Sequence, residues 1–265
     1  MTLLHRDGYS LHWDETGAGS PVLLIMGAVY SSAMWSPALP ALSKGHRLIR
    51  FDNRGTGSST WTAPASITDM AQDALAVLDA SGEQTAHVYG LSLGGVVALE
   101  LAKAAPERVR SLVLGCTCVL TRDKPRAPIE LNDILRTATR QALADTTLYG
   151  SVCPPDARAR HHAAVLADVA APEALVAQQD ALRAYAADLS DVARLTMPAL
   201  VLHGTEDPIV PVDWGRELAD TLPDSRLVVY EGCGHNYLVE MGDAPNCAVL
   251  DFLAEVDAVQ PVAQA

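Results

Sequence analysis

A serine flanked by glycines stands near the middle of the chain, in the segment Gly90-Leu91-Ser92-Leu93-Gly94-Gly95. A short apolar run ends at Tyr89, and a helix-forming stretch follows the segment. In that context the segment has the form of a nucleophile elbow, a sharp turn from strand to helix that exposes the serine hydroxyl. Glycine on either side relieves crowding between the strand and the helix, because it has no Cβ. We therefore predict that Ser92 is a nucleophile; the simpler alternative is a small residue at a turn.

A serine hydroxyl is a poor nucleophile near neutral pH, so it needs a base, and the base needs a partner that fixes its tautomer. In doubly wound sheets, reactive groups gather beyond the carboxyl ends of the strands. Asp207 follows an apolar run that ends at His203, and His235 follows the last apolar run. The order serine, aspartate, histidine is the chain order associated with this elbow. We predict that Ser92, Asp207 and His235 form a catalytic triad.

Other polar residues near these motifs have simpler interpretations. Glu206 adjoins Asp207 and is predicted to be solvated, and His203 is predicted to be a structural hydrogen-bonding residue at a strand end. His161 and His162 are predicted to lie on the surface, because a metal site would need further ligands that the sequence does not place.

Two further pairs of residues have more than one possible role. Asp52 and Arg54 could grip a substrate carboxylate, because arginine binds such a group through two hydrogen bonds, but the pair more often ties a glycine-rich loop to its neighbours. Cys116 and Cys118 follow an apolar run and are predicted to be packing residues. Neither pair is included in the predicted triad.

Short apolar runs alternate with helical stretches along most of the chain, a pattern typical of buried parallel strands with helices on both faces. A capping-box-like segment, Ser66-Ile67-Thr68-Asp69, predicts the start of an amphipathic helix. Further helices are predicted over 96–105 and around Trp214, Leu218 and Leu222. The fold class is therefore predicted to be α/β with a mostly parallel, doubly wound sheet. The strands are expected over Val22 to Met26, Arg47 to Phe51, Ala86 to Tyr89, Ser111 to Gly115, Ala199 to His203 and Arg226 to Tyr230.

The alternation stops between residues 121 and 195, where alanine-rich helical stretches are interrupted by prolines. We predict a helical cap over 121–195, inserted into a core made of residues 1–120 and 196–265; irregular core helices are the alternative. The cap would contribute apolar side chains to a substrate pocket, namely Leu131, Ile134, Leu135, Leu148 and Tyr149.

Composition narrows the classes of partner. The chain has 265 residues, of which 49% are hydrophobic, and a formal net charge of −13 without a basic stripe, so nucleic-acid binding is disfavoured. The five cysteines are an odd set without metal-ligand spacing, which favours reduced thiols and no metal site. The N-terminus lacks a secretory apolar core, and the sequence lacks an apolar stretch long enough to span a membrane. We expect a cytoplasmic protein that acts on a small molecule; the sequence does not indicate its oligomeric state.

With these motifs in place, the sequence resembles the α/β-hydrolase superfamily. Besides the elbow and the acid and histidine loops, the resemblance covers the segment Leu24-Ile25-Met26-Gly27-Ala28 with Trp35, and the loop from Asp52 to Ser59. Within the superfamily the core is similar to carboxylic-ester and enol-lactone hydrolases, and the Met-Gly form of the first segment is similar to polyketide methylesterases. Many relatives have histidine where Met26 stands, so any polar role of that residue is absent or replaced here.

The resemblance implies both an oxyanion hole and a reaction. The backbone N–H groups of Ala28 and Leu93 would donate to the charge that develops on the carbonyl oxygen. The expected protein is a metal-independent serine hydrolase without a cofactor, which cleaves a small or medium-sized carboxylic ester or lactone through an acyl-enzyme. The alternatives are a perhydrolase or a biosynthetic cyclase that uses the same triad, a thioesterase, and a ligand-binding module with vestigial activity.

Overall fold

The computed structural model describes residues 2–61, 66–125, 144 and 148–259. Within these residues, eight strands form one sheet in the order β1-β2-β4-β3-β5-β6-β7-β8. The strands from β3 to β8 pair in parallel, whereas β2 pairs antiparallel with both β1 and β4. The predicted doubly wound, mostly parallel sheet is therefore confirmed. The strands are β1 (Thr2–Arg6), β2 (Tyr9–Thr16), β3 (Ser20–Ile25), β4 (His46–Phe51), β5 (Ala86–Leu91), β6 (Val109–Gly115), β7 (Ala199–Gly204) and β8 (Ser225–Tyr230).

The predicted apolar runs correspond to β3 through β8, and the sequence analysis missed the hairpin of β1 and β2. A local signal for this hairpin is present, because Asp7-Gly8 separates the two strands and Gly8 has a φ of +84°. An Asp-Gly pair between two strands is a typical hairpin signal, and glycine adopts the positive φ that the second turn position has here without a steric cost. The hairpin lies at the edge of the sheet, and β1 is largely exposed, so its apolar pattern is weak.

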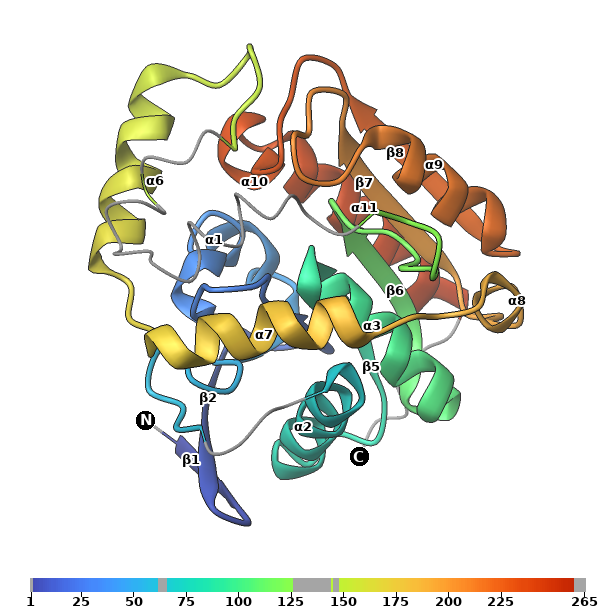
Figure 1. Cartoon of the computed structure of the whole chain (residues 1–265). Coiled ribbons are helices and arrows are strands. Elements are labelled where there is room, and N and C mark those ends of the chain that lie inside the picture. Colours follow the sequence, from blue (N-terminus) through green and yellow to red (C-terminus); the bar gives the residue numbers. More distant parts are fainter. Residues whose placement is uncertain (1, 62–65, 126–143, 145–147, 260–265) are drawn as a thin grey trace.

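Helices cover both faces of the sheet (Figure 1). The side chains of β3 alternate between two cores: Leu23 and Ile25 pack into a cluster with α2, α3 and α9, and Val22 and Leu24 pack into a cluster with α1 and α11. Because successive side chains of a strand point to opposite faces, both faces of β3 must be apolar. The helical segments are η1 (Ser32–Trp35), α1 (Leu39–Leu42), α2 (Ile67–Ala80), α3 (Leu93–Ala104), η2 (Pro106–Arg108), α6 (Pro155–Ala167), α7 (Pro172–Ala184), α8 (Leu189–Val192), α9 (Val212–Thr221), α10 (Tyr237–Glu240) and α11 (Ala244–Val259).

The predicted capping box at the start of α2 is confirmed. The Ser66 hydroxyl accepts a hydrogen bond from the Asp69 N–H at 3.1 Å, and the Asp69 carboxylate accepts one from the Ser66 N–H at 2.8 Å. These bonds satisfy two backbone donors that the first turn of a helix otherwise leaves without partners. The helix then buries Ile67, Met70 and Ala74 on one face, as its spacing predicted.

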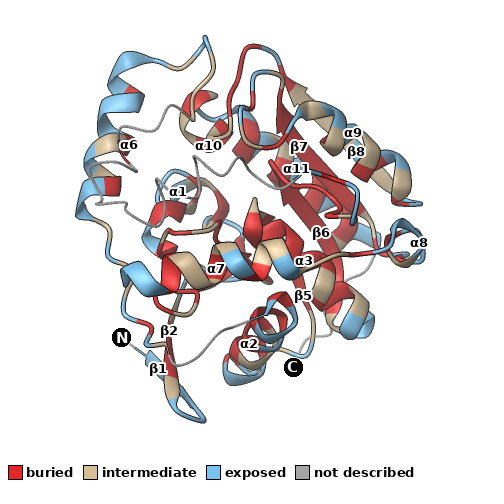
Figure 2. Cartoon of the chain, viewed as in Figure 1, coloured by how far each residue is buried: buried red, intermediate tan, exposed pale blue. Residues whose placement is uncertain are grey.

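The described part of the segment between β6 and β7 contains α6, α7 and α8, all of which fall within the predicted cap. Figure 1 shows α6 at one side of the molecule and α7 across its front. The segment joining α6 to α7 is tied to the core by backbone bonds: Gly57 N–H donates to the Val169 carbonyl at 2.7 Å, and Ala171 N–H donates to the Gly55 carbonyl at 2.9 Å. In Figure 2 the sheet is mostly buried and α6 exposes much of its outer surface. The division into core and cap remains a prediction.

Replacing Gly94 by alanine is expected to destabilise the fold severely. A Cβ at Gly94 would stand 2.0 Å from the carbonyl oxygen of Ile25, a backbone atom that cannot move without distorting β3. We expect the free energy of unfolding to fall by at least ~3 kcal/mol, as measured by urea denaturation. Gly45 is an exposed matched control with open space around its Cβ position, so Gly45→Ala should change the stability by less than ~1 kcal/mol. Equal stability of the two variants would contradict the close packing at Gly94.

Candidate active site

Ser92 lies at the turn between β5 and α3 with an unusual backbone conformation. Its φ is +52° and its ψ is −117°, a region that non-glycine residues rarely adopt. Such a conformation costs about 1–3 kcal/mol and persists only where the surrounding structure holds it. Here the Ser92 N–H donates to the Gly115 carbonyl at 2.8 Å, and the Thr117 hydroxyl donates to the Ser92 carbonyl at 2.8 Å. The backbone of Ser92 is therefore held from both sides by the end of β6 and the residues that follow it.

The glycines of the elbow are required by close contacts. A Cβ at Gly90 would stand 2.3 Å from the carbonyl oxygen of Gly94, where the strand and the helix cross. A Cβ at Gly95 would stand 2.5 Å from the side chain of Thr117. The steric reason inferred from the sequence is thus present in the structure, and it places Ser92 at the carboxyl edge of the sheet.

Asp207 lies in the loop after β7 and is almost fully buried. One carboxylate oxygen accepts hydrogen bonds from the N–H groups of Ile209 and Val210 at 2.8 and 2.9 Å, and the other receives Nδ1 of His235 at 2.7 Å. Burial by itself would raise the pKa of Asp207, but the charge of His235 and these hydrogen bonds hold it well below its usual value. The carboxylate is therefore ionised, and it fixes the proton of His235 on Nδ1.

His235 follows β8, its ring contacts Asp207, and it lines the same cavity as Cys116. Burial disfavours the imidazolium, but Cys116 and Asp207 together raise the pKa of His235 well above its ordinary value. Cys116 is buried, as predicted for a packing residue, but its position beside the imidazole was not foreseen. Its φ is +41°, so the chain turns at this residue instead of continuing β6, and no period-2 pattern could have placed it.

The loop that carries His235 is held by backbone hydrogen bonds that the sequence analysis did not predict. The N–H of His235 donates to the Leu148 carbonyl at 2.7 Å. The buried carboxylate of Glu240 accepts from the N–H groups on either side of the histidine, Gly234 at 3.0 Å and Asn236 at 3.2 Å. It also accepts from the Gly150 N–H at 2.8 Å. The position of the imidazole thus depends on the core and on the predicted cap.

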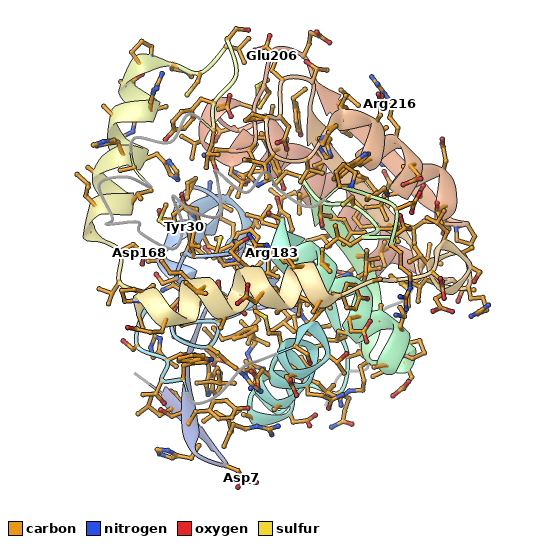
Figure 3. All side chains as sticks on the ribbon, viewed as in Figure 1. Asp7, Tyr30, Asp168, Arg183, Glu206 and Arg216 are labelled. Carbon is orange, nitrogen blue, oxygen red and sulfur yellow. The ribbon has the colours of Figure 1, made fainter. Side chains whose placement is uncertain are left out.

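Ser92 and His235 line the same cavity, which has a volume of about 200 Å³. Figure 3 shows two other residues of the lining, Arg183 on α7 and Tyr30 beside that helix. Within the described residues, no hydrogen bond joins the Ser92 hydroxyl to the His235 ring. In sites without a ligand this bond is often long and tightens only when a substrate is bound. The structure therefore brings the three predicted triad residues to one site, with the histidine–aspartate bond already formed.

The two predicted oxyanion donors flank Ser92. Leu93 is the first residue of α3, where backbone N–H groups have no partner within the helix. Ala28 lines the cavity, while the N–H of the next residue, Val29, donates to the side chain of Gln178 in α7 at 2.8 Å. The Cβ position of Gly27 is 3.4 Å from the Cβ of Ser92, so this loop passes directly beside the serine. The role of Gln178 in holding this loop was not predicted from the sequence.

The structure also decides between the alternatives for neighbouring polar residues. His203 is fully buried and its Nε2 donates to the Val210 carbonyl at 2.8 Å, which confirms a structural role. Glu206 is exposed, as predicted, and it binds the backbone N–H and the hydroxyl of Ser151 at 2.7 and 2.9 Å. Figure 3 shows Glu206 beside the loop that precedes α6. This contact gives the acid loop a tie to the predicted cap.

Asp52 and Arg54 form part of the scaffold, in agreement with the favoured interpretation. Asp52 accepts hydrogen bonds from the Ser32 hydroxyl at 2.7 Å and the Ser58 N–H at 2.9 Å, and it lies 3.0 Å from Nδ1 of His12. The Arg54 guanidinium is paired with Asp73, far along the chain. With these partners, both side chains fasten the loop that follows β4.

The prediction that His161 lies on the surface is wrong. Only 9% of the residue is exposed, and it lines the cavity. Ala157, His161 and Val165 are the buried positions of α6, at a spacing of four residues, which is the signal that could have found it. Among the predicted pocket residues, Leu148 lines the cavity, Tyr149 is half-buried beside it, and Leu131, Ile134 and Leu135 lie outside the described residues.

In the described part of the chain, no group of three histidine, cysteine, aspartate or glutamate side chains is arranged to hold a metal ion. Among the helices described, none is long and apolar enough to cross a membrane.

Comparisons with known proteins agree with this fold. A family model described as the alpha/beta hydrolase family matches residues 22–251. A protein of Variovorax paradoxus, named as a candidate carbamate hydrolase RutD, is 36% identical over 94% of this chain and 97% of its own length. The enol-lactonase from Burkholderia xenovorans LB400 superimposes with a TM-score of 0.83 at 26% identity, covering 96% of this chain and all of that one. A thermophilic esterase from Thermogutta terrifontis also has a TM-score of 0.83 at 26% identity, with 94% of each chain covered.

The contact between His235 and Asp207 predicts the pKa of the His235 imidazole. We expect an imidazole pKa above 6.5, measured by NMR and assigned by the loss of the resonance in His235→Gln. Asp207→Asn should lower this pKa by about 1–3 units, because it removes the negative charge that favours the imidazolium. Asp213→Asn is a matched control, since Asp213 is exposed on α9 and pairs with Arg216. A pKa of His235 that does not respond to Asp207→Asn would contradict the ion pair.

Proposed function

The chain belongs to the alpha/beta hydrolase family, and we propose that it is a metal-independent serine hydrolase of small or medium-sized carboxylic esters or lactones. The observation that carries this proposal is the 2.7 Å hydrogen bond between His235 and a buried, ionised Asp207, on the wall of the cavity that Ser92 also lines. Each group required for acyl transfer is then supplied by the chain itself, so the reaction requires no cofactor.

In the proposed reaction, His235 takes the proton of the Ser92 hydroxyl as its oxygen attacks the carbonyl carbon of the substrate. Asp207 holds the ring and stabilises the imidazolium that forms. The N–H groups of Ala28 and Leu93 donate to the oxyanion, and each donor of this kind contributes about 2.7–4 kcal/mol to the transition state. His235 then gives the proton to the leaving alcohol, and water attacks the acyl-enzyme in the same way to release the acid.

The cavity supports a substrate that is mainly apolar. Its lining includes Met26, Met34, Leu182, Ile209 and Trp214. The similarity to an esterase and to an enol-lactonase supports ester or lactone cleavage. The similarity to a candidate carbamate hydrolase makes carbamates a second class of substrate, and the same nucleophile would attack the carbonyl of either class.

The assignment of the nucleophile predicts the behaviour of Ser92→Ala. The kcat for a short-chain para-nitrophenyl ester should fall by about 10⁴-fold or more, because the variant lacks the hydroxyl that forms the acyl-enzyme. Labelling by a fluorophosphonate should disappear as well. Ser190→Ala, at an exposed serine of α8, is the matched control and should leave kcat within about twofold. Turnover and labelling that survive in Ser92→Ala would refute the proposal.

The assignment of His235 as the base also predicts how kcat/KM depends on pH. Imidazole must be neutral to accept the serine proton, so kcat/KM should rise with pH through the pKa of His235. Because that pKa is raised, the inflection is expected above 6.5. A pH–rate profile of the wild type checks this, and an acid limb with its midpoint below 6.5 would be inconsistent with His235 as the base.

A further inference from the structure

A pair of hydrogen-bonded side chains, one of them in the cavity wall, takes no part in the proposed reaction. Tyr149 precedes α6 and His161 lies within it, and the phenol oxygen of Tyr149 is 2.5 Å from Nδ1 of His161. Their rings meet edge to face, with the centroids 5.7 Å apart. His161 lines the cavity and Tyr149 is not among the residues of the lining. The phenol therefore binds the Nδ1 edge of the imidazole, which leaves the Nε2 edge available to the cavity.

Both partners are uncharged near neutral pH, which determines the direction of their hydrogen bond. Burial lowers the pKa of His161 to about 4 and raises the pKa of Tyr149 to about 12. An imidazole nitrogen with a lone pair is a much better acceptor than a phenol oxygen, so the Tyr149 hydroxyl donates to Nδ1 of His161. A neutral imidazole that accepts at Nδ1 carries its proton on Nε2. His161 is thus held in one tautomer.

The pair is connected to the reaction centre at both ends. Leu148, the residue before Tyr149, accepts the backbone N–H of His235 at 2.7 Å. The ring of Tyr30 packs edge-on against His161 at 6.3 Å, and Tyr30 is two residues from the proposed oxyanion donor Ala28. A substrate held at Ser92 would therefore lie in the same cavity as His161.

We propose that His161 determines substrate specificity by donating a hydrogen bond from Nε2 to a second oxygen of the substrate, beyond the carbonyl that is cleaved. This inference rests on the proposed function and specifies its substrate class: esters or lactones with a keto or ester carbonyl in addition to the scissile one. A purely apolar substrate would exclude water from this donor without replacing its hydrogen bond, which is unfavourable. An acceptor on the substrate removes that penalty, and sites built in this way discriminate strongly against analogues that lack the acceptor.

Matched ester pairs test the proposal. The probes are para-nitrophenyl 4-oxopentanoate against the pentanoate, and para-nitrophenyl 5-oxohexanoate against the hexanoate, with each kcat/KM divided by the rate of spontaneous hydrolysis. The wild type should prefer the oxo ester of at least one pair by about tenfold or more. His161→Phe should reduce this preference to within about twofold, mainly through KM. His162→Phe, at the adjacent position of α6 and outside the cavity lining, should retain it.

Two conservative variants separate binding of the substrate from support of the fold. The amide nitrogen of glutamine reaches the position of the imidazole Nε2, whereas that of asparagine reaches only the position of Nδ1. His161→Gln should therefore keep part of the preference for the oxo ester, and His161→Asn should lose it. A merely structural role would lower kcat/KM for both members of a pair and leave their ratio unchanged. No preference in the wild type, or a preference that His161→Phe retains, would overturn the proposal.

Equilibrium binding distinguishes a failure of this inference from a failure of the proposed function. In Ser92→Ala the Kd values of an oxo ester and of its apolar partner are measured by calorimetry, with and without His161→Phe. A difference in Kd that disappears with His161→Phe supports the donor, whatever the nucleophile. If Ser92→Ala still hydrolyses the esters at the wild-type rate, the proposed function fails while the result for His161 stands on the ratio of the matched pairs.

Discussion

The crossing of β5 and α3 at Ser92 is the constraint on which the site depends. Gly90 lets β5 and α3 approach more closely than any side chain would permit, and Gly94 does the same for α3 and the end of β3. The turn between β5 and α3 holds Ser92 at a positive φ. That conformation is unfavourable in isolation, so the parallel sheet on both sides must hold it. The same turn places the serine at the first N–H groups of α3. Packing, backbone strain and the proposed oxyanion site are therefore consequences of one contact.

A buried charge is the second organising feature. Asp207 remains ionised in the interior because two backbone N–H groups, His235 and His203 surround its carboxylate. The histidine in turn depends on Glu240 and on the Leu148 carbonyl, which belongs to the segment between β6 and β7. This segment thus supplies part of the cavity wall and also helps to position the proposed base. A change in how it packs would affect both substrate binding and the geometry of His235.

The segment between β6 and β7 is also where the sequence-based interpretation was weakest. The core strands β3 to β8 and the start of α2 have strong local signals, namely continuous apolar runs and a capping box. The position of His161 has only a weak local signal in the sequence, because α6 buries three small or polar residues and lacks a clear apolar face. The turn at Cys116, where φ is +41°, has no local signal in the sequence. Its N–H donates to the carbonyl of Leu202 on β7, a residue distant in the chain. Contacts between residues distant in the chain decide such features.

From the sequence alone, one can derive the alternation of strands and helices, the elbow at Ser92, and the loops that carry Asp207 and His235. These follow from short-range chemistry: glycine where a Cβ cannot fit, apolar runs where both faces of a strand are covered, and polar residues where a strand ends. The tertiary structure decided that His161 faces the cavity, that Cys116 and His235 line the same cavity, and that Glu240 and Gln178 hold the two loops beside Ser92. These pairings join residues whose separation in the chain gives no local preference for contact, so only the packed molecule brings them together.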